Sequence, residues 1–219
     1  SNTACAIPYA VGDANFDSET TIADVLALVD FILQETTPSD AAFNNTDVNM
    51  DGELNIADVV IIVDIISGTV TGRASSGGSF AHVELSTDHQ LSELLVNLDY
   101  IGILKGIQFE LKYNPDLVTI GAPALSLMQE NVIITYSKLS DGHMKVIVAD
   151  LSGETVESNQ QDLVKIPYSF NGKITEVSGI SLSNIYVSGP KGKIADVSSR
   201  SVSADVKLVP GVFALHQNY

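Results

Sequence analysis

Two acidic loops hold the residues of this sequence that are best suited to chemistry. In residues 13–24, oxygen-bearing groups fall at positions 1, 3, 5, 7, 9 and 12 of a 12-residue loop, and these positions are Asp13, Asn15, Asp17, Glu19, Thr21 and Asp24. Carboxylate, amide and carbonyl oxygens at this spacing are the ligands that Ca²⁺ takes in loops of this length. The pattern predicts a calcium site in which Glu19 supplies its main-chain carbonyl and Thr21 acts through water.

The loop is repeated further along the chain. The 22 residues from Gly12 to Leu33 align without gaps on those from Thr46 to Ser67, at an offset of 34. The second set of ligands is therefore Asp47, Asn49, Asp51, the Glu53 carbonyl, Asn55 and Asp58. One such match could be a solvated acidic turn, but two with the same terminal Asp predict two calcium ions. Gly52 suits the sharp turn at position 6, whereas Ser18 must tolerate strain there, so we expect the first site to be weaker.

A helix is predicted behind each loop. The apolar residues follow the i, i+3, i+4, i+7 spacing of one helix face, at Val25, Leu28, Val29 and Ile32 and again at Val59, Ile62, Val63 and Ile66. The second segment is rich in β-branched residues and by composition alone could be a strand, so its helical interpretation depends on the preceding loop. Both segments are apolar on more than one face, and an apolar surface left on a small domain usually marks an interface.

Charge divides the 219-residue chain into two parts. The formal net charge is −16, and 12 of the 27 acidic residues but no Lys or Arg fall in residues 1–72. Eight of those 12 lie in the two loops, so they repel one another unless cations neutralise them. This charge argues against a nucleic-acid partner, because phosphates are bound mainly through Lys and Arg. Cys5 is the only cysteine, which excludes an internal disulfide and a cysteine-based zinc site, and no apolar run reaches the roughly 20 residues of a membrane span.

The second part of the chain has the period-2 pattern of strands. In GIQFELKY, the residues Ile107, Phe109, Leu111 and Tyr113 alternate with polar ones. Similar runs predict about nine strands, near 81–87, 93–100, 105–113, 117–121, 132–139, 143–151, 164–170, 180–187 and 201–208, with a hairpin turn at Asp141 and Gly142. We therefore expect a calcium-binding domain at 9–68, a Gly/Ser linker at 69–79 and a β-sandwich at 80–208.

The repeat resembles a dockerin domain, whose two loop-helix halves lack the incoming helix of an EF-hand and use Asp at position 12. This resemblance, over about Tyr9 to Gly68, implies an all-α module that folds around two calcium ions and docks on a cohesin domain. It also implies that loop positions 10 and 11 and the following helix read the partner. The corresponding residues are Ile22, Ala23 and Leu26 in the first repeat and Ile56, Ala57 and Val60 in the second. Because the pairs at positions 10 and 11 are identical, two binding orientations related by a half-turn are one possibility. The alternative for Ile22 and Ile56 is a place in the core of the loop strands.

The β-sandwich resembles a cohesin, on the segments LKGIQFELKYNPDLVTI, HMKVIVADLSGE, DLVKIPYSF and ISLSNIYVSGPKGK. The resemblance implies a jelly roll that receives dockerins on one flat sheet face, formed here by the strands near 105–113, 132–139, 143–151 and 180–187. It implies a cohesin domain in cis or in trans as partner of the dockerin, and dockerin-bearing proteins as partners of the sandwich. The alternative is another sandwich, such as an immunoglobulin-like spacer.

No arrangement of residues predicts catalysis. The four histidines share no spacing, and the sequence has neither a G-x-S-x-G nor an HExxH motif. The final residues, 209–219, resemble the opening of a C-terminal sorting domain of the type IX secretion route, which implies the surface of a bacterium. We therefore expect a non-catalytic, calcium-dependent interaction module of an extracellular or cell-surface protein, without membrane insertion. The alternative function is that the sandwich is a structural spacer packed on the dockerin-like domain in cis.

Overall fold

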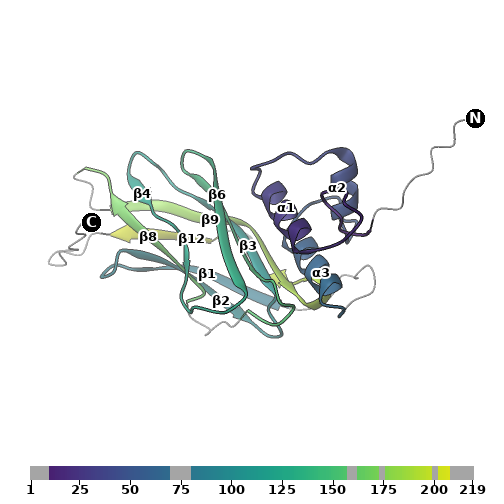
Figure 1. Ribbon diagram of the computed structural model, residues 1–219. Helices are drawn as coiled ribbons and strands as arrows, with labels where there is room; N and C mark the ends of the chain where they lie inside the picture. The colour runs from purple at the N-terminus through teal and green to yellow at the C-terminus, as the bar shows by residue number, and fades with distance from the viewer. Residues whose placement is uncertain (1–9, 70–79, 157–161, 173–175, 199–201, 208–219) are drawn as a thin grey trace, which may run out of the picture.

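The computed structural model of the chain describes residues 10–69, 80–156, 162–172, 176–198 and 202–207. The linker predicted at 69–79, apart from Thr69, and the sorting segment predicted at 209–219 lie outside these residues. A helical region at the N-terminal end packs against one side of a two-sheet β-sandwich (Figure 1). No helix among the described residues is long and apolar enough to cross a membrane.

The helical region consists of two loop-helix repeats with a short helix between them. Helices α1 (Ile22–Ile32) and α3 (Ile56–Ile66) begin directly behind the two acidic loops, as the sequence predicts. The β-branched α3 is a helix rather than a strand because a capping box starts it, in which Asn55 is the N-cap and Asp58 the third helical residue. The short helix α2 (Asp40–Thr46) was not expected; its N-cap Ser39 accepts a hydrogen bond from the backbone N–H of Ala42 at 3.1 Å.

The first sheet of the sandwich has the strand order β11-β1-β2-β8-β4, with β5 also paired to β8. Its strands are β1 (Phe80–Asp88), β2 (Glu93–Tyr100), β4 (Val118–Ile120), β5 (Ala124–Leu125), β8 (Val164–Phe170) and β11 (Asp196–Val197). All pairs are antiparallel except β1 with β11, which is parallel.

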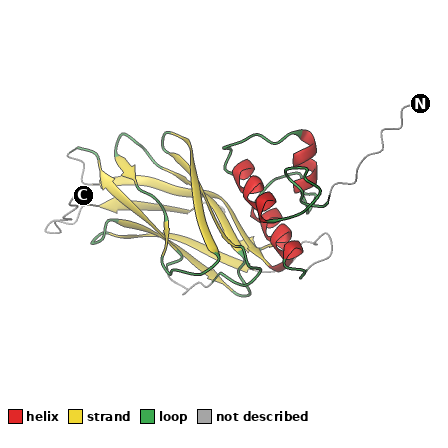
Figure 2. Cartoon of the chain, in the orientation of Figure 1, coloured by secondary structure: helices red, strands yellow, loops and turns green. Residues whose placement is uncertain are grey.

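The second sheet has the order β10-β9-β3-β7-β6, with β12 also paired to β9. Its strands are β3 (Gly106–Lys112), β6 (Val132–Ser140), β7 (His143–Asp150), β9 (Glu176–Gly189), β10 (Lys193–Ile194) and β12 (Val202–Lys207). The 3₁₀ turn η1 (Pro190–Gly192) connects β9 to β10. We call this second sheet the docking sheet, because its outer face carries the helical region (Figure 2).

The strand prediction is confirmed for all nine expected segments. The two-residue strands β5, β10 and β11 and the turn η1 were not predicted, since two residues are too short for a periodic signal. The hairpin between β6 and β7 turns at the expected Asp141 and Gly142, where Gly142 has a φ of +75°. An all-α region followed by a β-sandwich is therefore the fold.

The strand β3 is buried on both faces, although in a two-sheet sandwich one face of each sheet normally points to solvent. Its residues Ile107, Phe109 and Leu111 point into the sandwich core. The alternate residues Gly106, Gln108 and Glu110 point outward, yet they are also buried. The helical region provides their cover, and a second apolar cluster joins α1 and α3 to residues of the docking sheet such as Ile147 and Ala149.

Candidate calcium loops and a helix-on-sheet interface

The first acidic loop is organised by its two terminal carboxylates. Asp13 accepts hydrogen bonds from the backbone N–H groups of Phe16 at 2.7 Å and Ser18 at 2.9 Å. Asp24, at the other end, accepts one from the N–H of Ala14 at 2.8 Å. Both acidic residues are fully buried, so the loop wraps around its carboxylates instead of exposing them to solvent.

The second loop is organised in the same way, by a carboxylate at each end. Asp47 accepts from the backbone N–H groups of Asp51 at 3.1 Å and Gly52 at 3.0 Å, and Asp58 accepts from that of Val48 at 3.0 Å. The sequence repeat is thus also a repeat of backbone geometry.

Each loop turns through left-handed backbone at the same two positions. Position 6 has a φ of +76° at Ser18 and +86° at Gly52. The expected strain at Ser18 is therefore present, because this conformation disfavours a residue with a Cβ. Position 4 is left-handed as well, at Phe16 and Met50, which the sequence did not indicate.

The remaining predicted ligands line the loops without forming a carboxylate cluster. The amides of Asn15 and Asn49 donate to the carboxylates two residues later, at 2.9 and 2.8 Å. Thr21 and Asn55 are the helix N-caps, and Glu19 and Glu53 are exposed. Across the described residues, no three His, Cys, Asp or Glu side chains are grouped closely enough to hold a metal ion; the predicted sets draw on amide and carbonyl oxygens as well.

The electrostatics of the second loop fit a cation. Burial raises the pKa of Asp58 to about 7, and the nearby charges of Asp51 and Asp47 add to this increase, against two backbone hydrogen bonds that lower it. Residues 1–72 contain no Lys or Arg that could neutralise these acids. A hard cation held by oxygen ligands would supply the missing positive charge.

Helix α3 lies on the docking sheet and forms the interface between the two parts of the chain. It contacts β3, β7, β9 and the turn η1. Nine of its 11 residues are buried, although α1 covers only one of its faces. The sheet side of the apolar cluster consists of Ile133, Ile147, Ala149, Tyr186 and Ile194. These residues come from four of the strands of the docking sheet, including all those predicted to receive a dockerin except β3, which contributes a glycine.

Two glycines of the sandwich leave room for isoleucines of α3. A Cβ placed on Gly106 of β3 would lie 2.7 Å from Ile56 Cγ1, and one on Gly192 of η1 would lie 2.5 Å from Ile61 Cγ1. Neither distance is tolerated between real carbon atoms. The fit of α3 on the sheet therefore requires the absence of a side chain at both positions.

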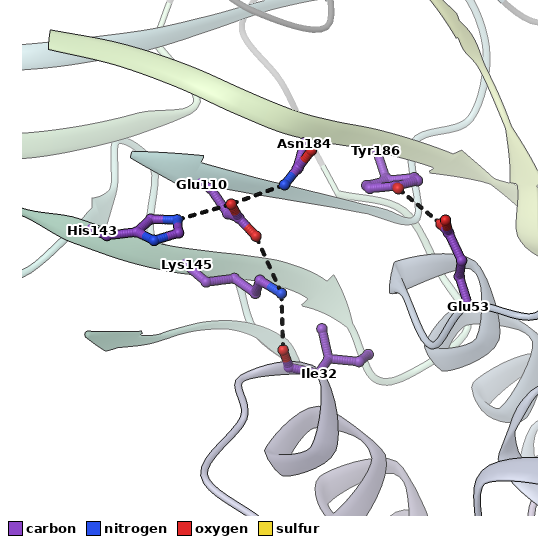
Figure 3. Close-up of polar contacts among 7 residues, drawn as sticks. All are labelled: Ile32, Glu53, Glu110, His143, Lys145, Asn184 and Tyr186. Atoms are coloured by element: carbon purple, nitrogen blue, oxygen red, sulfur yellow. Dashed lines mark hydrogen bonds and ion pairs between the residues drawn. The ribbon is translucent and has the colours of Figure 1, made fainter. Parts of the chain in front are cut away.

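Polar contacts hold the edges of the interface (Figure 3). Lys145 on β7 donates to the backbone carbonyl of Ile32, at the C-terminal end of α1, at 3.2 Å. The Tyr186 hydroxyl on β9 donates to the Glu53 carboxylate at 2.9 Å, so a residue of the second acidic loop contacts the sheet directly. At the far end of α3, the N–H of Lys191 in η1 donates to Asp64 at 2.8 Å.

A charged network positions Lys145 under α1. Glu110 on β3 lies 3.3 Å from Lys145 Nζ and accepts hydrogen bonds from the Asn184 amide and from the His143 ring, each at 2.9 Å. Burial acts to raise the pKa of Glu110, but His143, Lys145 and Asn184 together hold it below its ordinary value. The carboxylate therefore stays ionised at neutral pH and fixes the lysine (Figure 3).

The structure separates the predicted partner-reading residues by repeat. Those of the second repeat, Ile56, Ala57 and Val60, are at most 2% exposed and lie in the interface. Those of the first repeat face solvent, with Ile22 at 43%, Leu26 at 49% and Ala23 also exposed. The alternative of a core position is therefore wrong for Ile22, and Ile56 is buried against the sheet.

The receiving residues of the docking sheet were not predicted one by one. Gly106, Lys145 and Tyr186 occur in ordinary strand patterns that do not show which residue faces the helices. One signal was available: a glycine that begins a strand interrupts the side-chain pattern and often marks close approach by another backbone or ligand.

Comparison with known proteins identifies the helical region. Residues 11–66 match the model of the dockerin type I domain, a family that binds calcium in general. No curated protein matches the chain.

Solved structures similar to the chain include three bacterial proteins. One is a cohesin module from a family 33 glycoside hydrolase of Clostridium perfringens, with 16% identity, 59% of this chain and 97% of the other covered, and a TM-score of 0.47. Another is the sixth cohesin of scaffoldin B from Acetivibrio cellulolyticus, solved with a dockerin mutant, with 16% identity, coverages of 57% and 98% and a TM-score of 0.42. CaCohA2 from Clostridium acetobutylicum has 13% identity, coverages of 63% and 97% and a TM-score of 0.47. The region 11–66, with its paired acidic loops and two capped helices, therefore matches the dockerin type I domain in family model and in local structure.

Proposed function

We propose that the chain is a non-catalytic, calcium-dependent docking module of the dockerin–cohesin type, whose dockerin docks on the β-sandwich of the same chain. The observation that carries this proposal is the position of α3 on the outer face of the docking sheet. Its predicted partner-reading residues Ile56, Ala57 and Val60 are buried on the sheet face on which a cohesin is expected to receive a dockerin. The sandwich then acts as a cohesin-like receptor in cis.

Two calcium ions would organise the docking helix. We assign the first to Asp13, Asn15, Asp17, the Glu19 carbonyl, Thr21 and Asp24, and the second to Asp47, Asn49, Asp51, the Glu53 carbonyl, Asn55 and Asp58. The second ion matters more for docking, because its loop supplies both the N-cap of α3 and the carboxylate that Tyr186 contacts. Loss of this ion would leave the buried Asp58, at the start of the docking helix, beside the repelling carboxylates of Asp47 and Asp51.

Partners in trans would compete for the same surfaces. A dockerin from another protein would need the docking sheet that α3 covers, and a foreign cohesin would need the covered face of α3. We place the protein outside the cell or on its surface, where calcium is abundant enough to fill weak loops. The second candidate function is a permanent structural unit with no exchangeable docking; the apolar cluster shared by helices and sheet favours it.

Cleavage of the connection between the two parts separates these candidates. A protease site inserted between residues 70 and 79 of the full chain is cut, and the products are passed over a size-exclusion column with calcium and with chelator. Calcium-dependent docking predicts that the two products elute together in calcium and apart in chelator. Separate elution in calcium would contradict docking, and joint elution of folded products in chelator would favour the permanent unit. Ile56→Ala should release the products in calcium, whereas the matched Ile22→Ala should not, since Ile22 faces solvent.

A further inference from the structure

The two repeats offer the sheet nearly the same residues, but only one of them docks. Ile56 and Ala57 of the second repeat are fully buried against the sandwich, whereas the identical Ile22 and Ala23 are exposed. A half-turn of the helical region would exchange these pairs and place α1 where α3 now lies. Some residue must therefore make the observed orientation the more stable one.

Most of the contacts do not discriminate between the orientations. Asp64, which receives the N–H of Lys191, corresponds to Asp30, and Glu53 corresponds to Glu19. Lys145 donates to a backbone carbonyl, which the end of either helix provides. These contacts would survive the half-turn.

We propose that Ile61 determines the docking orientation, because its counterpart in the first repeat is Ala27. Ile61 is fully buried, and its Cγ1 and Cδ1 would lie 2.5 and 2.6 Å from a Cβ on Gly192. It fills the space that this glycine leaves in η1. Ala27 has three carbon atoms fewer and would leave that space open. Burial of about three methylene equivalents favours the observed orientation on the order of 50-fold.

The ends of the docking sheet report which orientation is present. The C-terminal end of α1 lies at Lys145, and the C-cap of α3, Ser67, lies beside Gly153. Lys145 is near the start of β7, and Gly153 is in the loop after its end. Lys145 and Asp150, the last residue of the strand, are five residues apart, roughly 17 Å. A half-turn would move the end of α1 by about that distance. The 11 peptide links from Thr69 to Phe80 can span up to roughly 36 Å, about twice that displacement.

The experiment measures this distance in the full chain with calcium. Spin labels are attached to Glu35→Cys, just after α1, and Lys138→Cys, on β6, in a Cys5→Ser background; Glu35 and Lys138 are both exposed. Double electron–electron resonance should give one short distance for the otherwise unchanged protein. The exchange variant Ala27→Ile/Ile61→Ala should give mainly a longer distance, with an increase of up to roughly 17 Å. Ala27→Ile alone keeps every contact of the present orientation and should add the longer distance to the short one.

This inference rests on the proposed docking, and the outcomes separate the two. A broad distance distribution in the unchanged protein would overturn docking and orientation together. A sharp short distance there, kept as the only distance by Ala27→Ile, would overturn the role of Ile61 alone. If the exchange variant fails to fold, the Ala27→Ile result still decides the question, because Ala27 is only half-buried and tolerates a larger side chain.

Discussion

The contact between Ile56 and Gly106 allows a quantitative test of the interface. A methyl group on Gly106 would lie 2.7 Å from Ile56 Cγ1, 2.8 Å from Ile56 Cδ1 and 2.9 Å from the Val148 carbonyl oxygen. Gly106 does not adopt a left-handed φ, so Gly106→Ala introduces a steric conflict without backbone strain. We expect it to destabilise the docked chain by about 1–3 kcal/mol, the usual effect of overpacking.

A double-mutant cycle isolates the contact. Ile56→Ala alone should lower the free energy of unfolding by about 2–5 kcal/mol, because a fully buried side chain is lost. In that background the methyl group of Gly106→Ala has room, and its added effect should fall by at least about 1 kcal/mol. The contact with the Val148 carbonyl is present in both backgrounds and cancels in the cycle.

Urea unfolding of the full chain in calcium, followed by far-ultraviolet circular dichroism, measures each corner of the cycle. Ile22→Ala is the matched control and should change the free energy by less than about 1 kcal/mol, since this side chain is 43% exposed. If the effects of Gly106→Ala and Ile56→Ala on the free energy of unfolding were strictly additive, the packing of Ile56 against Gly106 would be refuted.

Three further predictions concern the loops and the charged network. Chelation of calcium should remove the helical circular dichroism of residues 9–68 and leave the sandwich folded; an unchanged spectrum would contradict the coupling of metal binding to folding. Asp58→Ala should abolish one calcium site in calorimetry, because it removes the buried carboxylate that closes the second loop, and two sites of undiminished affinity would exclude this ligand assignment. Because the pKa of Glu110 is lowered in the folded chain, its stabilising effect is complete above the unfolded value near 4.5 and is lost as pH falls through the folded value. Acid unfolding should therefore be less steep in Glu110→Gln than in the unchanged protein, whereas Glu84→Gln, an exposed acid of the other sheet, should leave the profile unaltered.

The sequence predicted the elements whose signal is local. Each acidic loop specifies its turns and the start of its helix within 12 residues, and the alternation of apolar residues marks every strand of more than two residues. Even the strain at Ser18 follows from its place opposite Gly52 in the repeat. Helix α2 was missed because seven residues provide less than two full turns of apolar periodicity, although Ser39 after Pro38 is an N-cap signal.

The choice between the repeats could not be predicted, because it depends on two distant segments together. Ile61 is one apolar residue among several in α3, and its partner Gly192 is 131 residues later in a turn too short to recognise. Likewise, Lys145 and Glu110 are ordinary strand residues until the docked helices bury them. Only the packing of one region on the other gives these residues their roles.

Because only the second repeat docks on the sheet, the two loops differ in their effect on the interface. The first turn of α3 contains both Asp58, which closes the second acidic loop, and Ile56, which fits over Gly106. A cation that orders this loop therefore also fixes the position of Ile56, two residues before Asp58. Docking of Ile56 in turn stabilises the loop conformation that binds the cation. The corresponding turn of α1 has the same capping box but faces solvent. Under the proposed ligand assignment, calcium in the first loop would stabilise the fold of the helical region, whereas calcium in the second loop would act on the interface itself.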